Sequence, residues 1–258
     1  MIGSEAPTPG GERAGAGRPA VTLVANADST LALAREGFVR AGLADARERV
    51  MALVVRPGVE LGDDAVADYE RAATAELATF IGRRPGLVYE AHSTDYQAPD
   101  ALRRLAEDHF AILKVGPWLT FAYREAVFAL EAVERELLGG LPGVRLSGVR
   151  AALDAEMLAQ PGRWRPYYSG DARELPRARA FGYSDRCRYY WPRPPVREAL
   201  AVLPRNFSGR PLPEALLSQY LPDEHDAVGA GLFESEPTAL IRHHIGKVLD
   251  RCAAACGQ

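Results

Sequence analysis

Residues 87–97, LVYEAHSTDYQ, hold more potential chemistry than any other stretch of the sequence, because a short apolar run leads directly into Glu90, His92 and Asp95. Glu90 and His92 are two positions apart, so on a strand they point to the same face. His92 could act as a general base or bind a divalent metal such as zinc, and Asp95 could orient its ring. The alternative interpretation is a hydrogen-bonded histidine that only closes a loop.

Lys114 is the second candidate, and it interrupts the apolar stretch FAILKVGP of residues 110–117. The only other lysine is Lys247 near the C-terminus. Burial would lower the pKa of Lys114 and suit it to Schiff-base chemistry or phosphate binding. The alternative is a structural lysine paired with a carboxylate.

Further polar residues follow the other predicted strands. Glu5 follows the first strand and Arg56 the second, so both could lie at the same ligand-binding end of the strands and bind substrate. Gly116 offers a backbone N–H group for a phosphate. Asp185 and Arg186, in the run SDRCR, could clamp an anionic ligand, with a structural ion pair as the alternative.

These residues are carried by an alternation of strands and helices. Apolar strands are expected near residues 1–5, 49–55, 87–91 and 110–115, and helices over about 28–42, 64–81, 99–108 and 119–138. Repeated strand–helix units indicate a parallel sheet, whose carboxyl ends carry the ligand site in α/β proteins. The predicted class is therefore α/β.

The number of strands limits the architecture. About four strand–helix units can be counted, fewer than the eight of a closed (β/α) barrel. We expect a partial TIM-type (β/α) barrel over residues 1–140. A mainly helical, aromatic-rich C-terminal region over residues 141–258 is expected to pack on it.

Composition excludes several classes of protein. The chain has 258 residues, 47% of them hydrophobic, and a formal net charge of −3, which gives no general attraction for nucleic acid or an anionic membrane. No apolar stretch is long enough to span a bilayer. Three cysteines without metal-site spacing indicate free thiols. These features predict a cytoplasmic globular protein.

Several segments together resemble a known family, the non-catalytic (GatZ/KbaZ) subunit of class II D-tagatose-1,6-bisphosphate aldolase. The matching segments run in the family's order along nearly the whole chain: IGSEAPTPGG, VVRPGVE, the stretch from EAHSTDYQ through ILKVGP, YYSGD, YSDRCRYYWPRP, LLSQYLP and EPTALIRHHIGKVL. The combination of EAHSTDYQ, ILKVGP and SDRCRYYWP is highly specific.

The resemblance implies a longer TIM-type barrel of which this chain corresponds to the C-terminal part. The family's first strands, with a strand-end Asp-His-Leu-Gly motif where a metal ligand would be expected, have no counterpart. A misassigned start, a split or truncated gene, or a separate polypeptide that supplies the other half would each explain this.

The resemblance also implies a function. Members support a separate catalytic subunit that cleaves D-tagatose 1,6-bisphosphate into dihydroxyacetone phosphate and glyceraldehyde 3-phosphate, in galactitol, N-acetylgalactosamine or tagatose catabolism. The expected partners are that subunit and a sugar phosphate; self-association into a homo-oligomer is left open. The alternatives are a metal-dependent aldolase or epimerase of ketohexoses in its own right, or an inactive fragment. The family's older naming as a tagatose-6-phosphate kinase has no support, because no P-loop is present.

Overall fold

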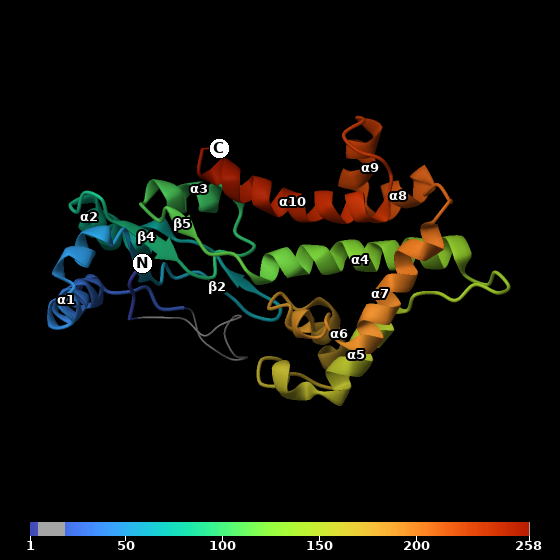
Figure 1. Ribbon diagram of the computed structural model, residues 1–258, viewed down its shortest axis with the longest axis horizontal. Coiled ribbons are helices and arrows are strands. Elements are labelled where there is room, and N and C mark those ends of the chain that lie inside the picture. The colour runs from blue at the N-terminus through green and yellow to red at the C-terminus, as the bar shows by residue number, and fades with distance from the viewer. Residues whose placement is uncertain (5–18, 258) are drawn as a thin grey trace. The chain divides into compact units, whose positions relative to one another are not determined.

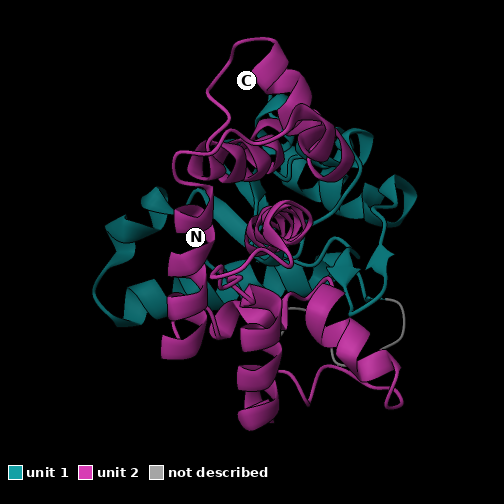
Figure 2. Ribbon diagram, turned by 90° about the vertical axis from the view of Figure 1, so that its right-hand side faces the viewer, with its two compact units in different colours: residues 1–117, 251–258 teal, residues 118–250 magenta. Residues whose placement is uncertain are grey.

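The computed structural model describes residues 1–4 and 19–257, which form two compact units. Unit 1 comprises residues 1–117 and 251–258, and unit 2 comprises residues 118–250 (Figure 2). The protein is mixed α/β, mostly helical with a small parallel sheet (Figure 1). The boundary that the sequence suggests at residue 140 stays a prediction.

Unit 1 is built on a three-stranded parallel sheet of β1 (Ala52–Val55), β4 (Val88–Ala91) and β5 (Ile112–Leu113), in the order β1-β4-β5. Ile2 adds a parallel bridge to Leu53 on the free side of β1. All four segments thus lie side by side in chain order. The apolar side chains of β1 and β4 are mostly buried in the core of this unit, as expected for strands of a parallel sheet, whereas the two residues of β5 are half-buried.

Helices connect and flank these strands. The helical segments of unit 1 are α1 (Val24–Arg40), the 3-10 turns η1 (Ala44–Arg49) and η2 (Arg71–Thr74), α2 (Ala75–Gly82) and α3 (Pro99–Glu107). Pro99 occupies the first turn of α3, where its missing N–H group is not needed.

One predicted element of unit 1 is wrong in its extent. In place of a helix over residues 64–81, the chain first forms the antiparallel hairpin of β2 (Glu60–Leu61) and β3 (Val66–Ala67), then η2, and enters an α-helix only at Ala75. The hairpin closes with a hydrogen bond from the N–H of Gly62 to the carbonyl oxygen of Ala65. The long-range pairing overrides the local helical pattern.

Unit 2 is helical, and the predicted long helix is present as α4 (Pro117–Leu138). The remaining helical elements are α5 (Val149–Ala159), η3 (Pro161–Arg163), α6 (Glu174–Phe181), η4 (Arg186–Tyr189), α7 (Pro194–Phe207), α8 (Glu214–Tyr220), α9 (Pro222–Gly229) and α10 (Pro237–Ala255). Among the described residues, no helix is both long enough and apolar enough to cross a membrane.

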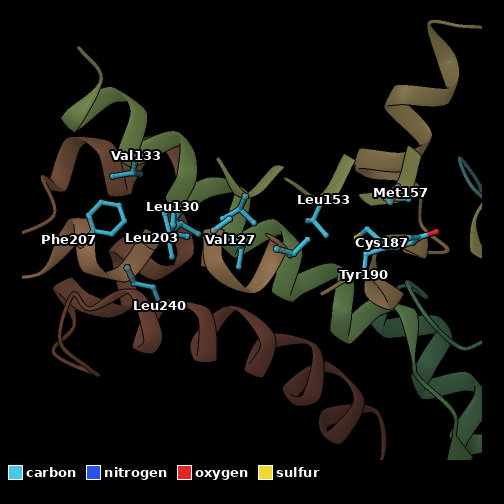
Figure 3. Close-up of a cluster of buried hydrophobic side chains, with 14 of the residues drawn as sticks. Val127, Leu130, Val133, Leu153, Met157, Cys187, Tyr190, Leu203, Phe207 and Leu240 are labelled. Carbon is cyan, nitrogen blue, oxygen red and sulfur yellow. The ribbon is translucent and has the colours of Figure 1, made fainter. Parts of the chain in front are cut away.

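The core of unit 2 combines aliphatic and aromatic side chains. Val127, Leu130, Leu153, Leu203 and Leu240 belong to one cluster of buried residues, drawn in Figure 3. Many aromatic residues that the sequence concentrates after residue 160 are in the same cluster or pack against it: Trp164, Tyr167, Tyr168, Tyr190 and Trp191. These aromatic side chains therefore contribute to the packing of the core of unit 2.

Candidate functional site

The strand register places three candidate residues at one level of the sheet in unit 1. Val55 pairs with Ala91, and Ala91 pairs with Leu113. One residue beyond these pairs, at the carboxyl ends of the strands, stand Arg56, His92 and Lys114. The carboxyl end of a parallel sheet is where α/β proteins bind ligands, so this edge is the candidate site.

Glu90 is the centre of this site. Its side chain is 3% exposed, and its Oε1 lies 2.8 Å from Nε2 of His92. The same oxygen lies 3.5 Å from Nζ of Lys114, whose side chain is 58% exposed. Glu90 and His92 therefore share a face of the strand, as their spacing predicts, and the lysine of the neighbouring strand joins them.

The environment keeps His92 neutral. Burial lowers the pKa of the imidazole, the positive charge of Lys114 lowers it further, and Glu90 opposes both. A neutral ring carries one N–H group, and the hydrogen bond to Glu90 requires that group on Nε2. Nδ1 then carries the lone pair and is the atom that can accept a proton.

The loop after β4 is tied to the chain after β5. The N–H and the hydroxyl of Thr94 each contact the carbonyl oxygen of Lys114, at 3.3 Å and 3.2 Å. Asp95 is buried, and its Oδ1 accepts a 2.9 Å hydrogen bond from the N–H of Gly116. The Gly116 N–H group, predicted as a phosphate donor, is thus engaged by Asp95.

The backbone of this loop takes unusual conformations. Ser93 and Tyr96 have φ angles of 59° and 61°, in the left-handed region that non-glycine residues seldom adopt. Such conformations persist where the surrounding structure over-determines them, and they occur often at functional sites. Asp95 lies between them in the sequence, and its hydrogen bond with Gly116 is one of the contacts that hold the loop.

Gln97 is a positioning residue that the sequence did not indicate. Its side chain is buried; its amide oxygen accepts a 2.9 Å hydrogen bond from the N–H of Tyr69, and its Nε2 donates to the carbonyl oxygen of Ala67 over 2.9 Å. It fixes the end of the polar loop against the last residue of β3 and the segment that follows it. Its place at the end of the EAHSTDYQ stretch was the one available signal.

Arg56 and Glu5 complete the residues expected in unit 1. The backbone of Arg56 exchanges hydrogen bonds with Thr22, through the Thr22 hydroxyl at 2.8 Å and the Thr22 N–H at 2.9 Å. Its half-buried side chain forms no ion pair with any described residue. Glu5 lies outside the described residues.

Asp185 and Arg186 belong to unit 2 and have structural partners there. Asp185 accepts a 2.7 Å hydrogen bond from Nε of Arg124, and both side chains are at most 2% exposed. Arg186 donates from Nε to the carbonyl oxygen of Arg163 over 2.7 Å and stacks on Tyr167 at 3.6 Å. Arg124, which fixes Asp185, was not anticipated from the sequence.

The donor set for a metal is small. Among residues 1–4 and 19–257, no group of three or more His, Cys, Asp and Glu side chains is arranged to hold an ion. His92 and Glu90 together supply two donors, whereas catalytic zinc sites commonly use three protein ligands. These residues do not fit such a site by themselves, so no step is derived through a metal.

A cavity of 670 Å³ in unit 1 lies at the opposite ends of the strands. Ile2, Val50 and Leu87, which precede or begin the paired segments, line it together with α1. Its charged lining includes the exposed ion pair of Asp28 and Arg84 at 3.0 Å. Among the described residues that line this cavity, no set of polar side chains meets at a buried carboxylate, as His92 and Lys114 do at Glu90. The carboxyl ends of the strands therefore remain the candidate site.

The site therefore joins a buried carboxylate, a neutral imidazole and an ammonium group at the carboxyl ends of parallel strands. This combination can move a proton and balance negative charge on a ligand. Together with the parallel sheet, it defines an α/β protein whose polar candidate residues gather at the strand ends.

Comparison with known proteins identifies the family. The model of the GatZ/KbaZ-like family, described as D-tagatose-1,6-bisphosphate aldolase subunit GatZ/KbaZ-like, matches residues 1–257. The chain belongs to this family, and the resemblance predicted from EAHSTDYQ, ILKVGP and SDRCRYYWP is confirmed.

A solved structure is also similar: the crystal structure of a probable tagatose 6 phosphate kinase from Sinorhizobium meliloti 1021. It has 41% sequence identity and a TM-score of 0.86. The match covers 92% of this chain and 60% of that one, so this chain spans less than two thirds of its relative.

Proposed function

We propose that this protein is a supporting, non-catalytic subunit of a class II D-tagatose-1,6-bisphosphate aldolase. It binds a separate catalytic subunit in the cytoplasm and raises its stability and activity in the catabolism of galactitol, N-acetylgalactosamine or tagatose. The observation that carries the proposal is the family match over residues 1–257.

The polar edge of the sheet is the proposed sugar-phosphate site of this subunit. Lys114 extends an ammonium group to the strand ends with 58% of its side chain exposed, and Arg56 stands at the same level of the register. Lysine and arginine are the side chains that bind phosphate. Glu90 and His92 supply polar groups for sugar hydroxyls.

We also propose that the sheet is a segment of a TIM-type barrel. The support is topological: Ile2, β1, β4 and β5 neighbour one another in parallel and in chain order. Consecutive parallel strands separated by helices are the repeating unit of that barrel.

Reconstitution with a catalytic subunit tests the supporting role. A class II tagatose-bisphosphate aldolase catalytic subunit is purified with and without this chain, and cleavage of D-tagatose 1,6-bisphosphate is followed by release of dihydroxyacetone phosphate. We expect co-elution, a higher kcat and a longer half-life on heating. No co-elution and no change in either rate would overturn the proposal.

The second candidate function is catalysis by this chain itself, favoured by the convergence of Glu90, His92 and Lys114. In aldol cleavage or epimerisation of a ketohexose or its phosphate, His92 Nδ1 or Glu90 would accept the proton that leaves the substrate. Lys114 would stabilise the negative charge that develops on the substrate oxygen. A divalent metal remains a prediction from the sequence, and metal analysis of the purified protein tests it.

One pair of variants separates the two functions. Lys114→Met removes a charge from the site, whereas Arg103→Ala removes an exposed charge on α3. If this chain is the catalyst, Lys114→Met lowers its own turnover by ~100-fold or more and Arg103→Ala leaves it unchanged. If the chain only supports its partner, it has no turnover of its own, and both variants still stimulate the catalytic subunit.

A further inference from the structure

Unit 2 contains a cavity of 380 Å³ that neither proposed function uses. Residues of α4, α5 and α6, together with Cys187 of η4, line it. Every lining residue belongs to unit 2. The volume is that of a site for a small metabolite.

The floor of this cavity is apolar. Leu153, Met157 and Cys187 line it, and all three are at most 2% exposed and belong to the core cluster drawn in Figure 3. Burial raises the pKa of the Cys187 thiol well above its usual value, so the thiol is neutral. A ligand that reaches the floor would therefore bury a hydrocarbon part there.

The rim carries three guanidinium groups, of which one has a carboxylate partner. Nε and Nη2 of Arg179 donate to the two carboxylate oxygens of Asp154, at 2.6 Å and 3.2 Å. Arg135 and Arg150 are exposed and form no ion pair within 4.0 Å in the part of the chain that the structure describes.

Aromatic and acidic neighbours hold Arg150 in place. Its guanidinium lies 4.8 Å from the ring of Phe181 and 5.9 Å from that of Phe128. Its backbone N–H donates to the carboxylate of Glu131 over 3.1 Å, and burial raises the pKa of that carboxyl group. The lining carries three guanidinium groups, those of Arg135, Arg150 and Arg179, against the two carboxylates of Glu131 and Asp154, so the rim is net positive.

We propose that this cavity binds a small organic anion, a carboxylate or phosphate head group on a short apolar body. Arg135 and Arg150 bind the head group at the rim. The body lies on Leu153, Met157 and Cys187. The charge of the rim and the apolar floor together select this class over neutral hydrocarbons and over inorganic anions.

Calorimetric titration of the full chain tests the proposal with four probes: hexanoate, hexyl phosphate, hexanol and inorganic phosphate. We expect hexanoate or hexyl phosphate to bind, and hexanol and inorganic phosphate to bind at least about tenfold more weakly, because each lacks one part of the ligand. The order of the two organic anions identifies the preferred head group.

Three variants at the cavity and one control variant locate the site. Arg135→Gln and Arg150→Gln should each weaken binding of the better anion about tenfold, whereas Arg197→Gln, at an exposed position of α7, should not. Ala151→Trp, at an exposed lining position, should block the cavity, with an unchanged circular-dichroism spectrum as proof of folding. The proposal is overturned if neither anion binds, if hexanol or inorganic phosphate binds as tightly, or if Arg135→Gln, Arg150→Gln and Ala151→Trp all bind like the parent.

Discussion

Oε1 of Glu90 lies 2.8 Å from Nε2 of His92 while the same oxygen lies 3.5 Å from Nζ of Lys114. One buried carboxylate oxygen thus lies close to both the imidazole of His92 and the ammonium group of Lys114. The protonation of His92 depends on both neighbours, because the lysine lowers the pKa of the imidazole and the glutamate raises it.

Two substitutions should therefore move the pKa of His92 in opposite directions. Lys114→Met removes a positive charge and should raise the pKa of His92. Glu90→Gln removes the negative charge that stabilises the imidazolium and should lower it. Titration of the ring protons by NMR measures both shifts.

Arg103→Ala is the matched control for this pair, because Arg103 is an exposed cation of the same unit with its own partners, Asp100 and Glu107. The His92 titration should be unchanged in this variant. Shifts of the same sign in Lys114→Met and Glu90→Gln would contradict the assigned arrangement.

The centre of this site was predictable because it follows from local periodicity. The spacing of Glu90 and His92 puts them on one face of a strand, and the parallel order of the sheet brings the strand that carries Lys114 alongside. The end of β4 and the end of β5 then have to meet. These relations need only strand assignments, which the apolar runs supply.

The remaining contacts depend on pairings that no local pattern encodes. Gln97 reaches Tyr69, 28 positions earlier in the chain, and Arg124 reaches Asp185, 61 positions later. The hairpin of β2 and β3 likewise replaces the start of an expected helix. Such features are decided by tertiary packing and need the folded structure.

The buried pair of Arg124 and Asp185 should make a large contribution to the stability of unit 2. Arg124→Met leaves Asp185 as an uncompensated buried charge, and the free energy of unfolding should fall by about 3–5 kcal/mol. Asp185→Asn should have a similar effect, since it leaves Arg124 unpaired. The double variant should lose less than the sum of the two. Urea denaturation curves measure all three.

The control for this prediction is an exposed ion pair. Asp100→Asn on α3 removes the partner of Arg103 and Arg104, and should shift the denaturation midpoint little, because exposed pairs are weakly stabilising. Equal losses of unfolding free energy in Asp100→Asn and Asp185→Asn would contradict a large contribution of the buried pair to stability.

Stability should depend on pH through Glu224, which is buried and lies 3.2 Å from Nδ1 of His244 and 3.0 Å from Nζ of Lys247. Hydrogen bonds from His244, His243 and Lys247 lower the pKa of Glu224 to about 2, although burial opposes them. Burial lowers the pKa of His244, but hydrogen bonds to Glu125 and Glu224 outweigh it and raise that pKa to about 9. The stabilisation by Glu224 is present above about pH 4.5 and is lost as pH falls towards 2. That by His244 is present below about pH 6.5 and is lost as pH rises through 9.

His244→Gln should therefore remove the alkaline part of this dependence. The free energy of unfolding of the parent, measured by thermal unfolding, should fall by about 2–3 kcal/mol between pH 6.5 and 9. The free energy of unfolding of the variant should change less over the same range. His225→Gln, at a half-buried histidine beside Asp226, should keep the parent's profile. A parent whose stability rises with pH in this interval would contradict the assigned cluster.

The close approach of the N-terminal segment to β1 gives the last prediction. A Cβ atom added at Gly3 would lie 2.6 Å from Cβ of Val54, far inside van der Waals contact. Gly3→Ala should therefore lower the free energy of unfolding by about 1–3 kcal/mol through overpacking.

Gly37→Ala is the matched control, because Gly37 is inside α1 and an added Cβ would meet nothing within 4 Å. That substitution should raise stability by about 0.5–1 kcal/mol, since alanine restricts the unfolded chain and favours the helix. Urea denaturation of both variants decides the matter: a Gly3→Ala protein as stable as Gly37→Ala would mean that residues 2–4 do not lie along β1 as the bridge between Ile2 and Leu53 places them.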